Sequence, residues 1–269
     1  MVRPRPASFR MKAWASCATG FAADFVMQPL SRVKPGRVLS TWGGQIKLST
    51  RPQVAAKVAD CIASWSNIEQ SLCFFLSMLL HASENAITAM LAATESRAAQ
   101  LRMIEAAAMA EMPQNYYDSF SVMLTSQIRP AMKERDKLAH WCWGVSDELP
   151  DDLLIMKPSE TVTSQLEAIK VQAVTAEPLV RIESKREIFV VTAGDMDRTY
   201  DRFEAARESL RCATGMVWVK NTPQERDQAH VLLLQSPQIR SGLEALNASR
   251  QKKSESQPPS PAPEPSGGM

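Results

Sequence analysis

The sequence predicts a mainly α-helical protein with a small β flap inserted after its third helix. Apolar side chains recur at intervals of three and four residues over most of residues 52–145, which is the spacing of one helical face. After Pro150 the pattern changes to short β-type runs, and after Thr192 helix-starting residues return. Because amphipathic helices bury their apolar faces against one another, we expect residues 52–145 to form three packed helices.

The first of these helices is expected over residues 51–82. Its inner face is marked by Val54, Val58, Ile62, Trp65, Ile68, Leu72, Phe75 and Leu79. A second helix is expected over residues 83–110, with Ser83 as its N-cap and Pro113 beyond its end. The third is expected from Gln114 to Gly144. Pro130 lies inside it and lacks a backbone N–H, so this helix should kink or restart there.

Three β-type runs, residues 153–156, 179–182 and 187–192, predict the flap. A polar segment of undetermined structure separates the first two runs. Thr192 then has the character of an N-cap for a helix through about Lys220. The segment Thr222-Pro223-Gln224-Glu225 is typical of a capping box, and Ser236-Pro237 repeats the pairing of a cap with proline. Two short helices are therefore expected, ending near Leu246.

Composition divides the chain into three parts. Residues 1–51 hold nine of the 31 Lys and Arg but only one acid, Asp24, so they form a basic arm that we expect to be partly disordered. This arm could contact nucleic acid or a membrane surface, serve as a targeting peptide, or be an extension of little consequence. Residues 52–247 form the predicted helical domain, with the β insertion at about 150–192. Residues 248–269 are polar and proline-rich, which predicts a disordered tail.

The same residues argue against several classes of protein. Five scattered cysteines without a Cys-x-x-Cys pair favour a reducing compartment, and we expect a cytoplasmic location. Three widely separated histidines argue against a metal site, and the sequence suggests no cofactor. The longest strongly apolar run, residues 72–80, is shorter than the roughly 18 residues of a membrane-spanning helix, so no membrane partner is expected.

One segment, Arg135-Asp136-Lys137-Leu138-Ala139-His140, concentrates the chemistry of the chain. Arg135 continues the apolar stripe of the third helix, so its guanidinium emerges where a hydrophobic side chain is expected, and a charge there requires an anion. His140 lies about 140° around an ideal helix from Arg135, which places the two side chains at the flanks of one groove. Asp136, four residues before His140, could fix the orientation and tautomer of the imidazole.

An Arg followed at this distance by His arises easily by chance, so the spacing alone is weak. The polar residue after Arg135, the ending Leu-Ala-His and the position near the end of a helix that follows two long amphipathic helices together resemble the motif of the HEPN superfamily. The resemblance covers residues 52–145 closely and residues 150–215 loosely. Pro130 upstream and the aromatic residues Trp141 and Trp143 downstream depart from the family pattern.

The resemblance implies an up-and-down helical bundle that forms a homodimer, with two motifs facing each other across the interface. Arg135 and His140 would be the catalytic pair, and Asp136 the supporting polar residue. It also implies a metal-independent endoribonuclease of the toxin or defence type that cuts single-stranded RNA and has a neutralising partner protein. Many members of the superfamily lack nuclease activity, so a catalytically inactive dimerisation or RNA-binding module is the alternative. An unrelated helical adaptor is a third interpretation.

The residue types suit RNA cleavage without a metal. A neutral imidazole can accept the proton of a 2′-hydroxyl that attacks the adjacent phosphate, and a planar guanidinium can bind that phosphate as charge builds. DNA lacks the 2′-hydroxyl and would be spared. Glu69 lies at the edge of the first helix's apolar face and could support Arg135, although a structural ion pair at the bundle boundary is the more ordinary role.

Three further side chains near the motif are not expected to take part in catalysis or RNA binding. Cys142 lies about 200° around a helix from His140, which disfavours a Cys–His nucleophile pair. Trp141 and Trp143 could stack on RNA bases, but packing in the core or in a dimer interface is the better interpretation.

Overall fold

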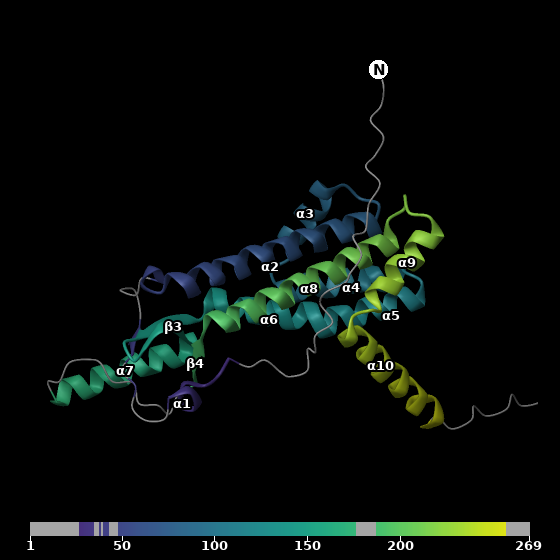
Figure 1. Cartoon of the computed structure of the whole chain (residues 1–269). Helices are drawn as coiled ribbons and strands as arrows, with labels where there is room; N and C mark the ends of the chain where they lie inside the picture. The colour runs from purple at the N-terminus through teal and green to yellow at the C-terminus, as the bar shows by residue number, and fades with distance from the viewer. Residues whose placement is uncertain (1–26, 35–37, 39, 43–47, 176–186, 257–269) are drawn as a thin grey trace, which may run out of the picture.

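Two long helices, α2 (Pro52–Leu79) and α8 (Ala193–Val217), form the spine of the protein and pack side by side along their length (Figure 1). The computed structural model describes residues 27–34, 38, 40–42, 48–175 and 187–256. The apolar stripe expected for the first helix is the buried face of α2, where Ile68, Phe75 and Leu76 are completely inaccessible to solvent. The prediction of one long helix at this point is confirmed.

The second predicted helix is two helices, α3 (Glu84–Ala92) and α4 (Arg97–Glu111). Ser83 caps α3, as predicted, and accepts a hydrogen bond from the backbone N–H of Ala86. Ser96 caps α4 in the same way through Ala99, so a second cap within the apolar pattern divides the segment. The prediction of a single helix over residues 83–110 was therefore wrong.

The third predicted helix consists of α5 (Gln114–Met123), the π-helical turn η2 (Leu124–Ile128) and α6 (Arg129–His140). The backbone N–H of Arg129 donates to the carbonyl of Leu124, five residues back, and Pro130 follows in the first turn of α6. A π turn is one way in which a helix absorbs a residue that cannot donate, so the restart expected at Pro130 is confirmed. The helix ends at His140, and Gly144 lies in a strand, contrary to the predicted end.

The flap is part of a four-stranded antiparallel sheet in the order β1 (Thr41–Trp42), β2 (Cys142–Ser146), β3 (Leu149–Met156) and β4 (Ile188–Val191). Two of the β-type runs predicted from sequence lie in β3 and β4, while residues 179–182 lie outside the described residues. Alternate residues of β3 face two apolar clusters. Leu153 and Ile155 join the main core, and Leu154 and Met156 pack with α1 (Leu30–Val33) and β4.

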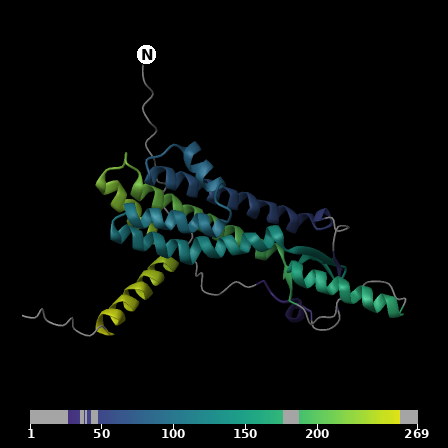
Figure 2. The same ribbon diagram turned by 180° about the vertical axis from the view of Figure 1, so that it is seen from behind.

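Three further helices complete the fold. The polar segment after β3 is a helix, α7 (Pro158–Thr175), which extends away from the sheet (Figure 1). The predicted N-cap at Thr192 begins α8, where it forms a capping box with Asp195. The predicted capping box at Thr222 begins α9 (Pro223–Leu233). The last helix, α10 (Pro237–Ser256), is longer than predicted and projects from the bundle beside α5 (Figure 2). The predicted tail boundary at residue 248 falls inside this helix.

The chain is thus mainly helical, with a small antiparallel sheet at one end of the helices. Within the described part of the chain, no helix is long and apolar enough to cross a membrane. The sheet end is where α6 leads into β2 and β4 leads into α8, with only one residue between the elements in each case. The short 3-10 turn η1 (Leu48–Thr50) precedes α2, and Arg51 donates a hydrogen bond to the carbonyl of Ser146 in β2. The start of α2 therefore lies at the same end.

Candidate functional site

The final turn of α6 carries the Arg–His motif to the junction between the helices and the sheet. Ala131 and Leu138 are buried and define the inner face of the helix. The helical period then determines the direction in which each side chain between them leaves the helix. Arg135 keeps only 15% of its side chain exposed, whereas His140 is exposed at the last helical position. Lys137 and His140 both lie in the last turn, where the unpaired carbonyls of a helix favour positive charge.

Arg135 and His140 contact each other directly. The distance between Arg135 Nη1 and His140 Nε2 is 3.3 Å. Because a guanidinium can only donate, this contact fits an imidazole whose Nε2 carries no proton and accepts the hydrogen bond. The two side chains are thus closer together than expected from an ideal helix, which would place them at the two flanks of a groove. The length of the arginine side chain spans the angular separation between the two positions.

The guanidinium of Arg135 has unused donors. Both of its hydrogen bonds leave from Nη1, one to His140 and one to Asp136 Oδ1 at 3.2 Å. Its Nε is buried, and no acceptor within the described residues lies within hydrogen-bonding distance of it. A buried donor without a partner costs about 1–3 kcal/mol, so an anion that engaged this edge of the guanidinium would relieve a cost already present in the fold.

Asp136 contacts a different group from the one expected, whereas Glu69 has the more ordinary role expected for it, a structural ion pair. Asp136 contacts Arg135 rather than the imidazole of His140, so in this structure it orients the guanidinium. Glu69 forms an ion pair with Arg97, the first residue of α4, rather than with Arg135. Each pair is partly open to solvent, and such surface pairs contribute at most about 1 kcal/mol to stability.

Arg97 is the functional candidate that sequence reasoning missed. Burial lowers the pKa of its guanidinium, the positive charge of Arg135 lowers it further, and Asp136 partly opposes the shift. The guanidinium groups of Arg97 and Arg135 are therefore close enough to repel each other. Ser96 is the signal that could have revealed Arg97. It is an N-cap residue directly before Arg97 and marks the start of a new helix rather than the middle of a long one.

The aromatic residues after the motif are held by packing. Trp141 lies 5.9 Å from the ring of Phe189, and the ammonium groups of Lys137 and Lys157 lie 5.8 and 5.9 Å from Trp141's ring centroid. Trp143 is partly buried against the main core. Packing is therefore the role that the structure shows for both tryptophans. The lysines around Trp141 add positive charge near the end of α6.

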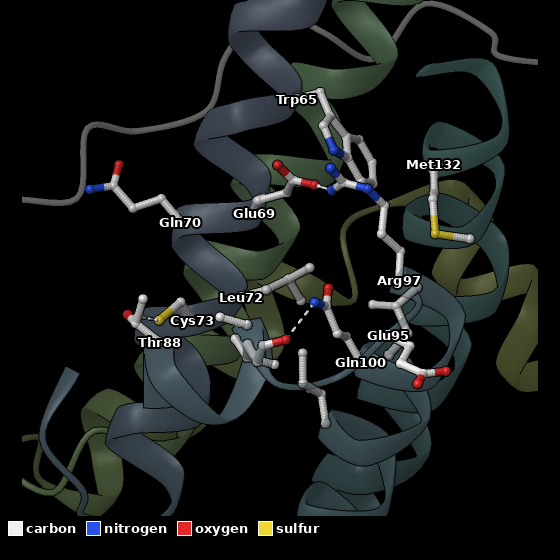
Figure 3. A pocket seen from close by; sticks show the side chains of 14 residues that line it. Trp65, Glu69, Gln70, Leu72, Cys73, Thr88, Glu95, Arg97, Gln100 and Met132 are labelled. Carbon is white, nitrogen blue, oxygen red and sulfur yellow. Dashed lines mark hydrogen bonds and ion pairs between the residues drawn. The ribbon is translucent and has the colours of Figure 1, made fainter. Parts of the chain in front are cut away.

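An open cavity of about 580 Å³ begins one helical turn away from Arg135. Met132, three residues before Arg135 on the same face of α6, forms part of its wall. Figure 3 shows Glu69 and Arg97 meeting beside Trp65 in this cavity. Within the described residues, no cluster of His, Cys, Asp or Glu could hold a metal ion.

Comparisons with known protein families, with curated proteins and with solved structures found no match to this chain.

Proposed function

We propose that this protein is a HEPN-like, metal-independent endoribonuclease that cuts single-stranded RNA by attack of a 2′-hydroxyl on the adjacent phosphate. The observation that carries the proposal is the contact between Arg135 Nη1 and His140 Nε2, because it joins a phosphate-binding group to a proton acceptor on an exposed helix end. The unpartnered Nε of Arg135 supports it, since a phosphate oxygen is an acceptor of the kind that this donor lacks.

The proposed reaction begins when a phosphate draws the guanidinium of Arg135 away from His140. The Nε2 atom so released accepts the proton of the 2′-hydroxyl, and the 2′ oxygen forms a bond to phosphorus. The bond from phosphorus to the 5′ oxygen breaks, and that oxygen takes up a proton. The products are a 2′,3′-cyclic phosphate and a 5′-hydroxyl. Throughout, the guanidinium binds the phosphate oxygens as their negative charge increases.

A homodimer would supply the second proton-transfer group. In this arrangement His140 of one chain acts as the base and His140 of the other donates the proton to the departing 5′ oxygen. The exposed position of His140 at the end of α6 leaves it accessible to both RNA and a second chain. RNA and a second copy of the chain are therefore the proposed partners, and a neutralising protein would be expected for a toxin of this kind.

The test is cleavage of a labelled single-stranded RNA by the purified full chain in the presence of EDTA. We expect the wild type to release products ending in a cyclic phosphate and His140→Ala to release none. Lys133→Ala is the matched control, because it truncates another exposed side chain of α6 without touching the pair. Expression of the wild type should also arrest growth of a host, and His140→Ala should relieve the arrest.

Two results would count against the nuclease. If the wild type leaves RNA uncut at every pH between about 5 and 8, the window in which imidazoles change charge, the proposed reaction is wrong. If the chain nevertheless binds RNA with Arg135-dependent affinity, the catalytically inactive RNA-binding module would be the better description.

A further inference from the structure

The cavity beside the motif lies between α2, α3, α4 and α6. Its apolar wall includes Leu72, Leu101 and Ile104, and Glu69 and Arg97 meet in it beside Trp65 (Figure 3). A volume of about 580 Å³ lies within the roughly 300–1,000 Å³ typical of small-molecule sites. The apolar surfaces could contact the flat faces of a planar ligand, and the polar groups could contact its edge.

Trp65 gives the cavity an unsatisfied donor. The residue is 2% exposed, and its indole Nε1 has no hydrogen-bond partner within the described residues. Figure 3 shows the indole turned toward the guanidinium of Arg97. Indole and guanidinium groups only donate hydrogen bonds, so these two side chains together favour a ligand edge that accepts them.

The acidic side chains of the cavity favour hydrogen-bond donors on the ligand. Among the described residues that line the cavity, Glu69 and Glu95 are acidic and Arg97 is basic, so the lining has one more negative than positive charge. A phosphate is disfavoured there, whereas a group with N–H donors is favoured. The part of the ligand inside the cavity should therefore be uncharged and planar, with acceptors and donors at neighbouring positions around its ring.

Guanine combines these properties. Its O6 and N7 are acceptors that a guanidinium can engage in a two-pronged manner, as in the commonest specific contact to this base. Its N1–H and N2–H₂ groups are donors that suit a carboxylate. Adenine presents an acceptor at N1, which would face the carboxylate of Glu69 unfavourably. Arg97 and Glu69, which pair with each other in this structure, would exchange that contact for the two halves of the guanine edge.

The position of the cavity relates the base to the phosphate. Met132 in its wall is three residues from Arg135 and four from Asp136, so these side chains are neighbours on α6, with Cβ atoms roughly 5–6 Å apart. The acidic cavity and the basic motif thus lie side by side. A nucleotide placed here would have its base among the acids and its phosphate beside Arg135.

We propose that this cavity is a guanine-binding site, in which Arg97 and Trp65 donate to O6 and N7 and Glu69 accepts from N1–H and N2–H₂. Its use in selecting a guanosine next to the cut phosphate rests on the proposed nuclease function, whereas binding of the base does not. The base could come from unpaired RNA or from a free guanine nucleotide, and the two sources are separated by the probes below.

The experiment titrates the full chain with GMP, AMP, CMP and UMP by calorimetry, and then with single-stranded RNA that contains or lacks guanosine. We expect GMP to bind at least ~10-fold more tightly than AMP, because a site built around specific hydrogen bonds rejects a ligand that leaves them unmade. Preference for guanosine-containing RNA over GMP would identify RNA as the source. Equal affinity for GMP and the RNA would identify a nucleotide site.

Two variants separate the cavity from the rest of the fold. Glu69→Gln should remove the preference for GMP over AMP, with Glu111→Gln on the exposed end of α4 as the matched control. Ala92→Phe should fill the cavity from the exposed side of α3 and abolish binding of GMP, whereas Ala89→Phe on the same helix lies outside the cavity lining and should not. Both positions on α3 are exposed, so neither variant should prevent folding.

The outcomes distinguish this site from the proposed nuclease. Guanine-selective binding without RNA cleavage would keep the site and remove the nuclease. Cleavage by a chain that shows no heat of GMP binding at millimolar concentration, and no change of cleavage pattern in Ala92→Phe, would keep the nuclease and overturn the site. Equal binding of all four nucleotides would also overturn it.

Discussion

Arg135 Nη1 lies 3.3 Å from His140 Nε2 and 3.2 Å from Asp136 Oδ1, so one guanidinium nitrogen connects an imidazole and a carboxylate. The Nε of the same guanidinium is buried and has no hydrogen-bond partner within the described residues. The Nε atoms of Arg51, Arg129 and Arg226 are unpartnered in the same way, so the two contacts from Nη1 are what distinguish Arg135. His140 and Asp136 together therefore orient this guanidinium.

The first prediction separates the chemistry of Arg135 from its packing. Arg135→Met keeps an unbranched apolar side chain in a site that is mostly buried and removes the unpartnered Nε, so the melting temperature should be unchanged or higher. RNA cleavage should be lost. Arg135→Lys should restore only part of it, because an ammonium keeps the charge but lacks the two-pronged planar donor. Full activity of Arg135→Met would contradict a role in phosphate binding.

The second prediction concerns the dimer. A carboxylate placed beside His140 in both chains would bring like charges together across the proposed interface and would also repel phosphate. Ala139→Glu should therefore convert a dimer to a monomer at micromolar concentration, as measured by sedimentation, and reduce cleavage. Ala139 and the control position Ala59 on α2 are both exposed, so Ala59→Glu should remain dimeric. A wild-type chain that is monomeric throughout this range would contradict the two-histidine reaction.

The third prediction tests how α10 is attached. A Cβ atom at Gly242 would collide with Cγ1 of Val122 in α5, although alanine is ordinarily favoured over glycine within a helix by about 1 kcal/mol. Gly242→Ala should therefore lower the melting temperature. In combination with Val122→Ala, which removes the colliding methyl group, the loss should be less than the sum of the two single losses. Gly194→Ala is the control, since the nearest atom to its added carbon is 3.7 Å away and its stability should not fall.

The fourth prediction is a pH dependence that arises from His230. Burial lowers the pKa of this imidazole below its ordinary value of 6.5, with Asp227 opposing the shift, and Nε2 lies 2.8 Å from Ser119 Oγ. The folded state therefore favours the neutral ring, and below about pH 6.5 the unfolded state binds the proton more readily. This contribution to stability is present above pH 6.5 and is lost as the pH falls through the folded pKa.

Chemical unfolding at several pH values measures the effect. His230→Gln should retain a hydrogen-bond partner for Ser119, and its unfolding free energy should decline less on acidification than that of the wild type. Above about pH 7 the unfolding free energies of the variant and the wild type should depend on pH in the same way. An identical decline in the variant and the wild type would assign the acid sensitivity to other groups.

Local signals in the sequence accounted for much of the fold. Three of these signals depend on neighbouring residues alone, and the structure contains all three as predicted. They are the period of the apolar residues in α2, the N-cap at Thr192 before α8 and the capping box at Thr222 before α9. The break at Ser96 was missed because an apolar pattern continues across it, and only the cap marks the new helix. The end of α6 was misplaced because Gly144 is required by close approach of the ring of Trp42 from β1, a contact between distant parts of the chain.

The candidate site divides in the same way. Arg135, Asp136 and His140 lie within six residues and could be found by their spacing, whereas the partner of Glu69 could not, because Arg97 reaches it from another helix. The cavity was also beyond sequence reasoning. Its walls come from four helices whose relative positions depend on side-chain packing rather than on any local pattern.

The last prediction concerns the turn that ends α2. His81 has a φ of 51°, in the left-handed region that residues with a Cβ seldom occupy, and the N–H of Ala82 donates to the carbonyl of Ser77, five residues back. This is the geometry of a helix C-terminus that usually contains glycine. His81 is exposed, so its side chain loses little by replacement. His81→Gly should therefore raise the free energy of unfolding by up to ~1 kcal/mol, because glycine adopts this conformation without strain. His81→Ala has no such freedom and should not share the gain, which makes the two variants a matched pair for thermal unfolding. Equal stabilities of the alanine and glycine variants would show that the left-handed conformation is not what determines stability at this position.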